Sequence, residues 1–214
     1  MTMSKSDIVY FDYAYEVFFQ HIEKYIELNE NKRNFLKEFM RISYYPAKSY
    51  YVKSGMKAKQ IGFLIKGSAI DSYEYNSKKI INRFYLENAF ITSIHSFITQ
   101  TEASSDIQFC ETTVLLEFDY LAYLNIKKNF PEINTIINFI QNDEILFYKN
   151  RLLSMQIKDA KQRLQQLLSD NPDTLDRFKM KYIATYLGIE HETLSRLKLY
   201  NKFTKSESFP NNIE

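Results

Sequence analysis

The sequence predicts an α+β protein that combines an antiparallel sandwich or barrel with a long helix and a small C-terminal helical domain. Short runs rich in β-branched and aromatic residues recur at about ten-residue spacing between residues 50 and 118, as in antiparallel sheets. A long apolar stretch without glycine or proline follows Pro131, and Pro172 separates it from a second helical unit. At 214 residues, with 45% hydrophobic and 25% charged side chains, the chain has a globular composition, which excludes a disordered protein or a fibre.

The N-terminal part, residues 10–41, is expected to be helical because apolar side chains recur at spacings of three and four between Val17 and Ile26. The β-rich part follows, with a turn expected at Asn76 and Ser77. The predicted strands are 50–52, 61–65, 68–75, 79–86, 105–111 and 113–118.

The residue types also indicate the compartment. Cys110 is the only cysteine, so no internal disulfide can form, and a reducing compartment is favoured. Asp7, Asp12 and Glu16 interrupt the apolar residues near the N-terminus, and no apolar run of about 20 residues occurs elsewhere. We therefore expect a soluble, cytoplasmic protein without a membrane partner.

A long helix is predicted from about residue 132 to residue 156. Pro131 suits its first turn, and residues 145–148 make the helix apolar on more than one side. Such a helix needs two covering surfaces, so a homodimer is expected, and charged residues at Ile137 and Ile140 are expected to give monomers. An ordinary core helix without a partner is the alternative. The apolar stripe consists of Ile133, Ile136, Ile137 and Ile140.

The segment 180–199 reads MKYIATYLGIEHETLSRLKL. Apolar residues line one side of a first short helix, Gly188 ends that helix, and Leu194 and Leu197 face inward from a second helix. The small Ala184 allows the two helices to cross closely. This pattern predicts a helix-turn-helix motif, and an ordinary helical hairpin is the alternative.

The exposed side of the second helix suits the major groove of DNA. Arg196 can donate two hydrogen bonds to guanine, and Glu192 can accept one from cytosine or orient the arginine, although a surface ion pair between them is the alternative. Residues 177–205 hold seven Lys or Arg and two Glu, a local charge of +5 against +2 for the whole chain. Double-stranded DNA is thus the expected partner. The candidate DNA-binding residues are Lys181, His191, Glu192, Thr193, Ser195, Arg196 and Lys198.

Most of the chain resembles the Crp/Fnr family of bacterial transcription regulators. The resemblance rests on residues 182–189 followed by 192–196, which are especially similar to the branch found in Bacteroidetes-type bacteria, as is the stretch 88–92. It implies a cyclic-nucleotide-binding-type β-roll (jelly-roll-like) at about 44–118, a long dimerisation helix and a helix-turn-helix domain. The implied domains are 1–130, 131–157 and 158–214.

The resemblance also implies roles for single residues. The recognition helix, about 190–199, would lie in the major groove with Glu192 and Arg196 contacting bases. His191 stands where relatives often carry an arginine. The chain after Leu199 is short and polar, so the β-hairpin wing of the relatives is expected to be missing.

The cyclic-nucleotide cassette of the family departs from its usual pattern in this chain. Relatives that bind nucleotides carry Gly-Glu and Arg-Ser or Arg-Thr there, whereas residues between Arg83 and Lys127 include no Lys or Arg. A buried phosphate without a cation is costly, so cyclic AMP and cyclic GMP are not expected to bind. An empty pocket, one filled by aromatic side chains, or one for a less anionic, unidentified effector is expected instead. The candidate pocket residues are Asn88, Ala89, Phe90, Ile91, Ser104 and Ser105.

No pattern of catalytic or metal-binding residues is evident. The three histidines are far apart in the sequence, and no P-loop or GxSxG motif occurs, so an enzyme, a metal site and a cofactor are not expected. His95 as a haem ligand and Cys110 as a redox sensor are minor alternatives to structural roles. The main alternative function is a β-roll ligand-binding or protein-interaction module that has lost DNA binding.

Overall fold

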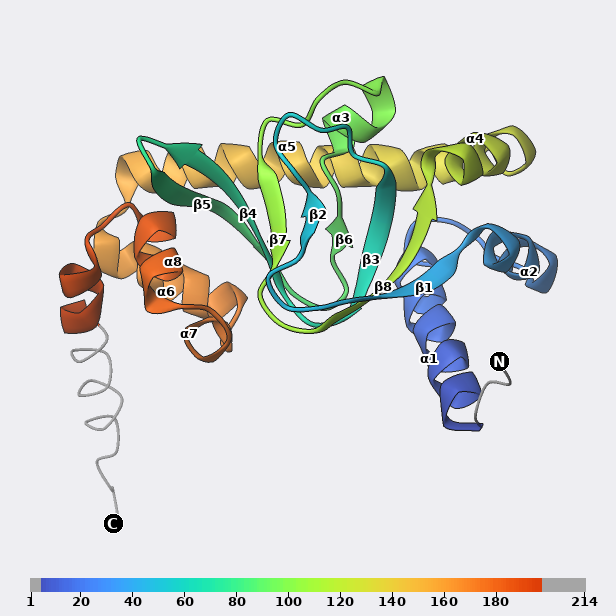
Figure 1. The fold of residues 1–214 in the computed structure, drawn as a ribbon, viewed down its shortest axis with the longest axis horizontal. Coiled ribbons are helices and arrows are strands. Elements are labelled where there is room, and N and C mark those ends of the chain that lie inside the picture. The colour runs from blue at the N-terminus through green and yellow to red at the C-terminus, as the bar shows by residue number, and fades with distance from the viewer. Residues whose placement is uncertain (1–4, 198–214) are drawn as a thin grey trace, which may run out of the picture.

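The computed structural model describes residues 5–197 and contains two four-stranded antiparallel sheets that form a roll (Figure 1). The order is β1-β8-β3-β6 in one sheet and β2-β7-β4-β5 in the other. This arrangement confirms the α+β class and the antiparallel core. The strands are β1 (Arg41–Tyr45), β2 (Tyr50–Val52), β3 (Gln60–Lys66), β4 (Ala69–Tyr75), β5 (Lys78–Tyr85), β6 (Phe90–Ile91), β7 (Asp106–Phe109) and β8 (Thr113–Asp119).

Two sharp turns position the strands. Asn76 and Ser77 have φ values of 48° and 59°, the left-handed conformation that a two-residue hairpin between twisted strands requires. Gly67 connects β3 to β4 with φ +111°, and a Cβ atom there would lie 2.8 Å from the Cα atom of Thr113. Only glycine therefore fits where the chain passes from one sheet to the other.

The N-terminal helices differ from the prediction. Residues 10–41 are not one helical stretch, because α1 (Lys5–Ile22) and α2 (Glu30–Phe39) are separate and β1 begins at Arg41. Asn29 starts the second helix, and its side-chain oxygen accepts a hydrogen bond from the Lys32 amide at 3.0 Å.

The helices after the roll were partly predicted. The short α3 (Ile94–Thr99) lies within the roll, between β6 and β7, whereas α4 (Tyr120–Asn129) was not expected, so the helical part after the roll begins at Tyr120 rather than near Pro131. Asp119, at the end of β8, caps α4 by accepting a hydrogen bond from the Ala122 amide. The long helix α5 (Ile133–Ile157) confirms the prediction and runs along the length of the roll (Figure 1).

The core of the roll includes the start of α5. The stripe of four isoleucines on α5 is buried against the roll and the N-terminal helices of the same chain. Ile137 and Ile140 are only 5% and 8% exposed. The expectation that these two residues face a partner subunit is therefore wrong, because the protomer itself covers them. A different face of α5 remains exposed, and it carries Ile145, Leu146, Leu152 and Leu153.

The C-terminal unit contains α6 (Ala160–Asp170), α7 (Thr174–Arg177), α8 (Met180–Leu187) and a further helix at residues 191–197. Its apolar cluster is not closed on itself. Leu164, Leu187 and Leu194 pack in one cluster with Ile70 of β4 and Ile81 of β5. The unit thus lies directly on the sheet that contains the β4–β5 hairpin. None of the helices in the described range is long and apolar enough to cross a membrane.

Candidate nucleic-acid interface and ligand pocket

Two short helices, α8 and the helix at 191–197, meet at Gly188. Gly188 ends α8 with φ +66°, its amide donates to the Thr185 carbonyl, and the Ile189 amide donates to the Ala184 carbonyl at 3.0 Å. These two bonds form a Schellman motif, which turns the chain sharply into the helix at 191–197. Leu194 is fully buried under the pair, so the opposite side of the second helix faces outward.

The predicted DNA-binding residues of the second helix include exposed and half-buried side chains. Thr193 and Ser195 are half-buried, and the Ser195 hydroxyl donates to the His191 carbonyl at 3.1 Å. Within the described range, Glu192 and Arg196 form no ion pair with each other, so their charged groups face solvent separately. Lys198 lies outside the described residues. The exposed members of the set are Lys181, His191, Glu192 and Arg196.

The positive charge of Arg177, near this helix pair, is neutralised by two carboxylates. Its guanidinium binds Glu87 at 2.6 Å and Glu111 at 2.6 Å, and these carboxylates, Glu87 foremost, raise its pKa. The estimate of +5 for residues 177–205 therefore overstates the charge available to phosphates. Sequence reasoning missed these pairs because the two glutamates are far from Arg177 in the chain.

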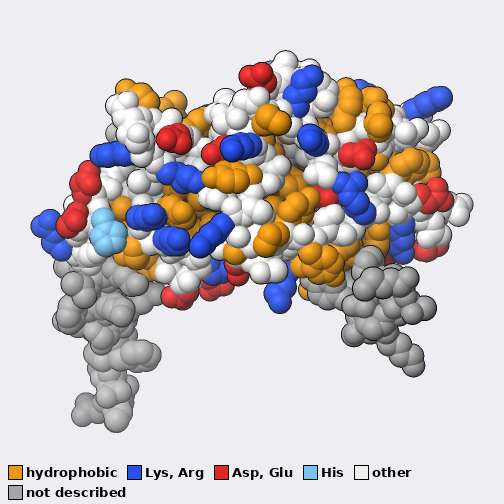
Figure 2. Space-filling model, viewed as in Figure 1, with side chains coloured by type: hydrophobic (Ala, Val, Ile, Leu, Met, Phe, Trp, Pro, Cys, Tyr) orange, Lys and Arg blue, Asp and Glu red, His pale blue; other side chains and the backbone are white. Residues whose placement is uncertain are grey.

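Two lysines from the roll add positive charge near the helix pair, where the charge of Arg177 is neutralised. Lys78 and Lys79, at the tip of the β4–β5 hairpin, line a groove of about 450 Å³ together with Lys181, Glu190 and His191. Figure 2 shows Lys and Arg side chains gathered on this face near the hairpin and the C-terminal helices. No sequence pattern connects the two lysines with the helix pair, because the contact joins segments about 100 residues apart.

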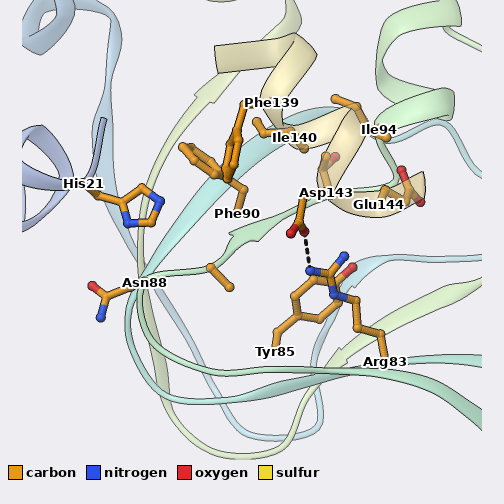
Figure 3. Close-up of a pocket in the computed structure, with 12 residues that line it drawn as sticks. His21, Arg83, Tyr85, Asn88, Phe90, Ile94, Phe139, Ile140, Asp143 and Glu144 are labelled. Carbon is orange, nitrogen blue, oxygen red and sulfur yellow. Dashed lines mark hydrogen bonds and ion pairs between the residues drawn. The ribbon is translucent and has the colours of Figure 1, made fainter. Parts of the chain in front are cut away.

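A cavity of about 230 Å³ lies between the roll, α1 and α5 (Figure 3). Of the predicted pocket residues, Asn88, Ala89 and Phe90 line it. Ile91 is fully buried in the core, and neither Ser104 nor Ser105 lines the cavity. The remaining lining residues, which sequence reasoning did not assign to a pocket, are His21, Arg83, Tyr85, Thr92, Ile94, Phe139, Ile140, Asp143 and Glu144.

The cavity does contain a cation, contrary to the argument from the sequence. Arg83 lines it, but its guanidinium binds the Asp143 carboxylate of α5 at 2.6 Å (Figure 3). Burial raises the pKa of Glu144, with Arg83 opposing this shift. Burial, and secondarily Lys24, lowers the pKa of His21 and favours its neutral form. An entering phosphate would have to compete with Asp143 for Arg83 and would lie near Glu144.

The minor alternatives can also be placed in the structure. Burial, followed by Glu111, raises the pKa of Cys110 to about 11, so its reactive thiolate is scarce near neutral pH. His95 is exposed on α3. Among residues 5–197, no group of three or more His, Cys, Asp or Glu side chains is placed to hold a metal ion.

Structural comparison defines the class of fold: the solved structures that match this chain include regulators of the Crp/Fnr type, which share its β-roll. The global regulator CLP of Xanthomonas campestris, described as c-di-GMP responsive, aligns with a TM-score of 0.66 at 14% identity, over 86% of this chain and 96% of that one. FixK2 of Bradyrhizobium japonicum aligns with a TM-score of 0.68 at 14% identity, over 81% and 89%. A putative crp/fnr-family regulator of Eubacterium rectale aligns with 0.64 at 12% identity, over 83% and 85%.

Sequence comparison is less informative than structure. No protein-family model matches the chain. A curated protein, the beta sliding clamp of Mycoplasma genitalium, is 25% identical over 90% of this chain and 52% of its own length. The chain thus spans about half of that protein, and identity at this level does not establish a family. The likeness to solved structures establishes the fold.

Proposed function

We propose that this chain is a sequence-specific, DNA-binding transcription regulator of the Crp/Fnr type. The observation that carries the proposal is the Schellman turn at Gly188, which joins α8 to a second helix with exposed Arg196, Glu192 and His191. That geometry is what a recognition helix needs to reach base edges in the major groove. The motif at residues 182–196 further supports a place in the Bacteroidetes-type branch of the family.

The proposed organisation follows the three implied segments: a sensor domain at 1–130, a dimerisation helix at 131–157 and a DNA-binding domain at 158–214. Ile145 and Leu152 are seven residues apart on α5, as are Leu146 and Leu153, and all four are exposed. A seven-residue repeat of exposed apolar side chains is typical of a helix that pairs with a copy of itself. We therefore propose a homodimer, which would act in the cytoplasm.

The cavity between the roll and α5 is proposed as an effector pocket, without a catalytic role. Its carboxylates, Asp143 and Glu144, outnumber its arginine, and this supports a neutral or less anionic effector over a cyclic nucleotide. Asn88, Ala89 and Phe90 remain the proposed ligand contacts, whereas the positions of Ile91, Ser104 and Ser105 do not favour such a role.

The second candidate is a ligand-binding or interaction module that has lost DNA binding. It is favoured by one observation, the close packing of the C-terminal unit on the β4–β5 sheet. There Arg177 forms ion pairs with two carboxylates, so its charge is not available to DNA. In this candidate the packing stabilises the fold and has no role in binding DNA.

Selection of bound sequences from random duplex DNA distinguishes the two candidates. A regulator is expected to enrich a two-fold symmetric site whose half-sites lie about 34 Å apart, one turn of DNA. Absence of any enrichment would favour the interaction module. Retention on non-specific duplex that declines as salt rises provides an independent measurement.

A further inference from the structure

The tip of the β4–β5 hairpin lies beside the first helix of the C-terminal pair. The backbone amide of Ile81 on β5 is 3.4 Å from the hydroxyl oxygen of Thr185 on α8, to which it donates a long hydrogen bond. Lys78 and Lys79 begin β5, immediately after the hairpin turn. The hairpin of the sensor roll thus places Lys78 and Lys79 at the edge of the proposed DNA-binding surface.

The groove between the hairpin and α8 carries an excess of positive charge. Three lysines, Lys78, Lys79 and Lys181, line it together with a single carboxylate, Glu190. His191, the first residue of the outward-facing second helix, forms part of the same wall. The groove is therefore continuous with the helix that we propose reads the bases.

Neutral side chains contact two of these lysines, and Lys79 also stands opposite Glu74 of β4 in the hairpin register. The Lys79 ammonium donates to the side-chain oxygen of Gln108 at 2.9 Å and lies 5.8 Å from the Tyr50 ring centre. Lys181 lies 5.4 Å from the ring centre of Tyr182. In the part of the chain that the structure describes, no carboxylate is within ion-pair distance of any of the three. Their charge is therefore still available to an external anion.

We propose that this groove binds the phosphate backbone of the duplex whose bases the second helix contacts. The hairpin of the sensor roll then supplies a contact to the DNA backbone from outside the proposed DNA-binding domain. The inference rests on the proposed function. Duplex DNA is favoured over an acidic protein segment because the groove opens beside His191, where the sugar-phosphate chain bordering the major groove would run.

The test is the salt dependence of DNA binding by a variant with Lys78→Gln and Lys79→Gln. Each phosphate contact contributes about −0.9 to the slope of log K against log salt, so loss of two contacts in each protomer of the proposed dimer should reduce the slope by about 3.6. Fluorescence anisotropy with a labelled random-sequence duplex measures it. Affinity for a selected operator and for random duplex should fall by the same factor, because phosphates carry no sequence information.

The matched control is Lys127→Gln with Lys128→Gln, which removes the same charge from exposed positions on α4, at the opposite end of the molecule (Figure 1). This control should keep the wild-type slope. An unchanged slope in the hairpin variant, or an equal fall in the control, would overturn the inference. If the double variant does not fold, the single variant Lys78→Gln, at an exposed position in each protomer of the dimer, should still reduce the slope by about 2.

Failure of the inference can be distinguished from failure of the proposed function. Wild-type protein that does not bind any duplex overturns both. Wild-type binding that depends on Arg196 but not on the hairpin lysines overturns only the inference. Binding of a poly-glutamate peptide that is lost in the hairpin variant, with DNA binding unchanged, would assign the groove to an acidic protein segment.

Discussion

Arg177 binds the carboxylate of Glu87 through both of its terminal guanidinium nitrogens, at 2.6 and 2.9 Å. The pair joins the C-terminal helices to the chain segment that follows β5. Beside it, the ring of Phe178 packs on Phe84 of β5 at a centroid distance of 4.3 Å. A bidentate ion pair and an aromatic contact together hold the C-terminal unit on the roll.

Loss of this ion pair should weaken the attachment of the C-terminal unit. We expect Arg177→Ala to lower the free energy of unfolding by about 1–2 kcal/mol, a modest value because both side chains are partly exposed. Urea denaturation at pH 7 measures the change. In a double-mutant cycle with Glu87→Ala, a coupling energy near zero would show that the pair contributes nothing.

The same pair predicts a pH dependence. Burial opposes ionisation of Glu87, but hydrogen bonds from Arg177 and the Gly67 amide outweigh it and lower the pKa of this carboxyl. Its contribution to stability is then fully present above the pKa of an unfolded glutamate, about 4.3, and is lost as the pH falls through the lower folded pKa. The stability difference between wild type and Arg177→Ala should therefore shrink below about pH 4. A difference that instead grows under acid would contradict this assignment.

The exposed face of α5 predicts the oligomeric state. Leu146 and Leu153 are 55% and 43% exposed, and charged side chains there would prevent burial between two copies of the helix. We expect wild-type protein to be a dimer at micromolar concentration and the variant Leu146→Glu with Leu153→Glu to be a monomer, by light scattering. Leu121→Glu, at an exposed position on α4, serves as the control and should remain dimeric. A monomeric wild type would contradict the proposal.

Base recognition is tested by Arg196→Ala. If Arg196 donates two hydrogen bonds to a guanine, its loss should cost about 1–3 kcal/mol of specific affinity and relax the preference at one base position. If Lys181 contacts phosphate alone, Lys181→Ala should weaken binding to all sequences alike. Competition binding with single-base operator variants separates the two effects. An unchanged base preference in Arg196→Ala would remove this residue from the reading role.

The effector pocket predicts a poor response to cyclic nucleotides. Because Asp143 occupies the guanidinium of Arg83, titration calorimetry of the wild type with millimolar cyclic AMP should show no binding. Asp143→Asn releases Arg83 and removes one negative charge, and we expect roughly a 10- to 100-fold gain in affinity for cyclic AMP. Micromolar binding by the wild type would contradict the role given to Asp143.

The sequence by itself determined the elements whose signals are local. Short runs of β-branched and aromatic residues at regular spacing predicted strands such as β4 and β8. Helical periodicity predicted the extent of α5, and Gly188 marked the turn between the two C-terminal helices. Local signals failed where an element is very short, as in the two residues of β6, or where a strand leads directly into a helix, as at Asp119. At Asp119 the capping side chain sets the boundary between strand and helix, and the periodicity of apolar residues carries no signal of a cap.

Only the tertiary structure decided which charges meet and which faces are free. Arg83 meets Asp143 across 60 residues and Arg177 meets Glu87 across 90, so the local count of charge misjudged both the pocket and the surface proposed to bind DNA. Periodicity likewise showed that α5 is apolar on several sides but not which side the roll would cover. The physical reason is that ion pairing and burial act through distances of a few ångströms in space, and packing of distant elements sets those distances, whereas periodicity reports only the conformation of neighbouring residues.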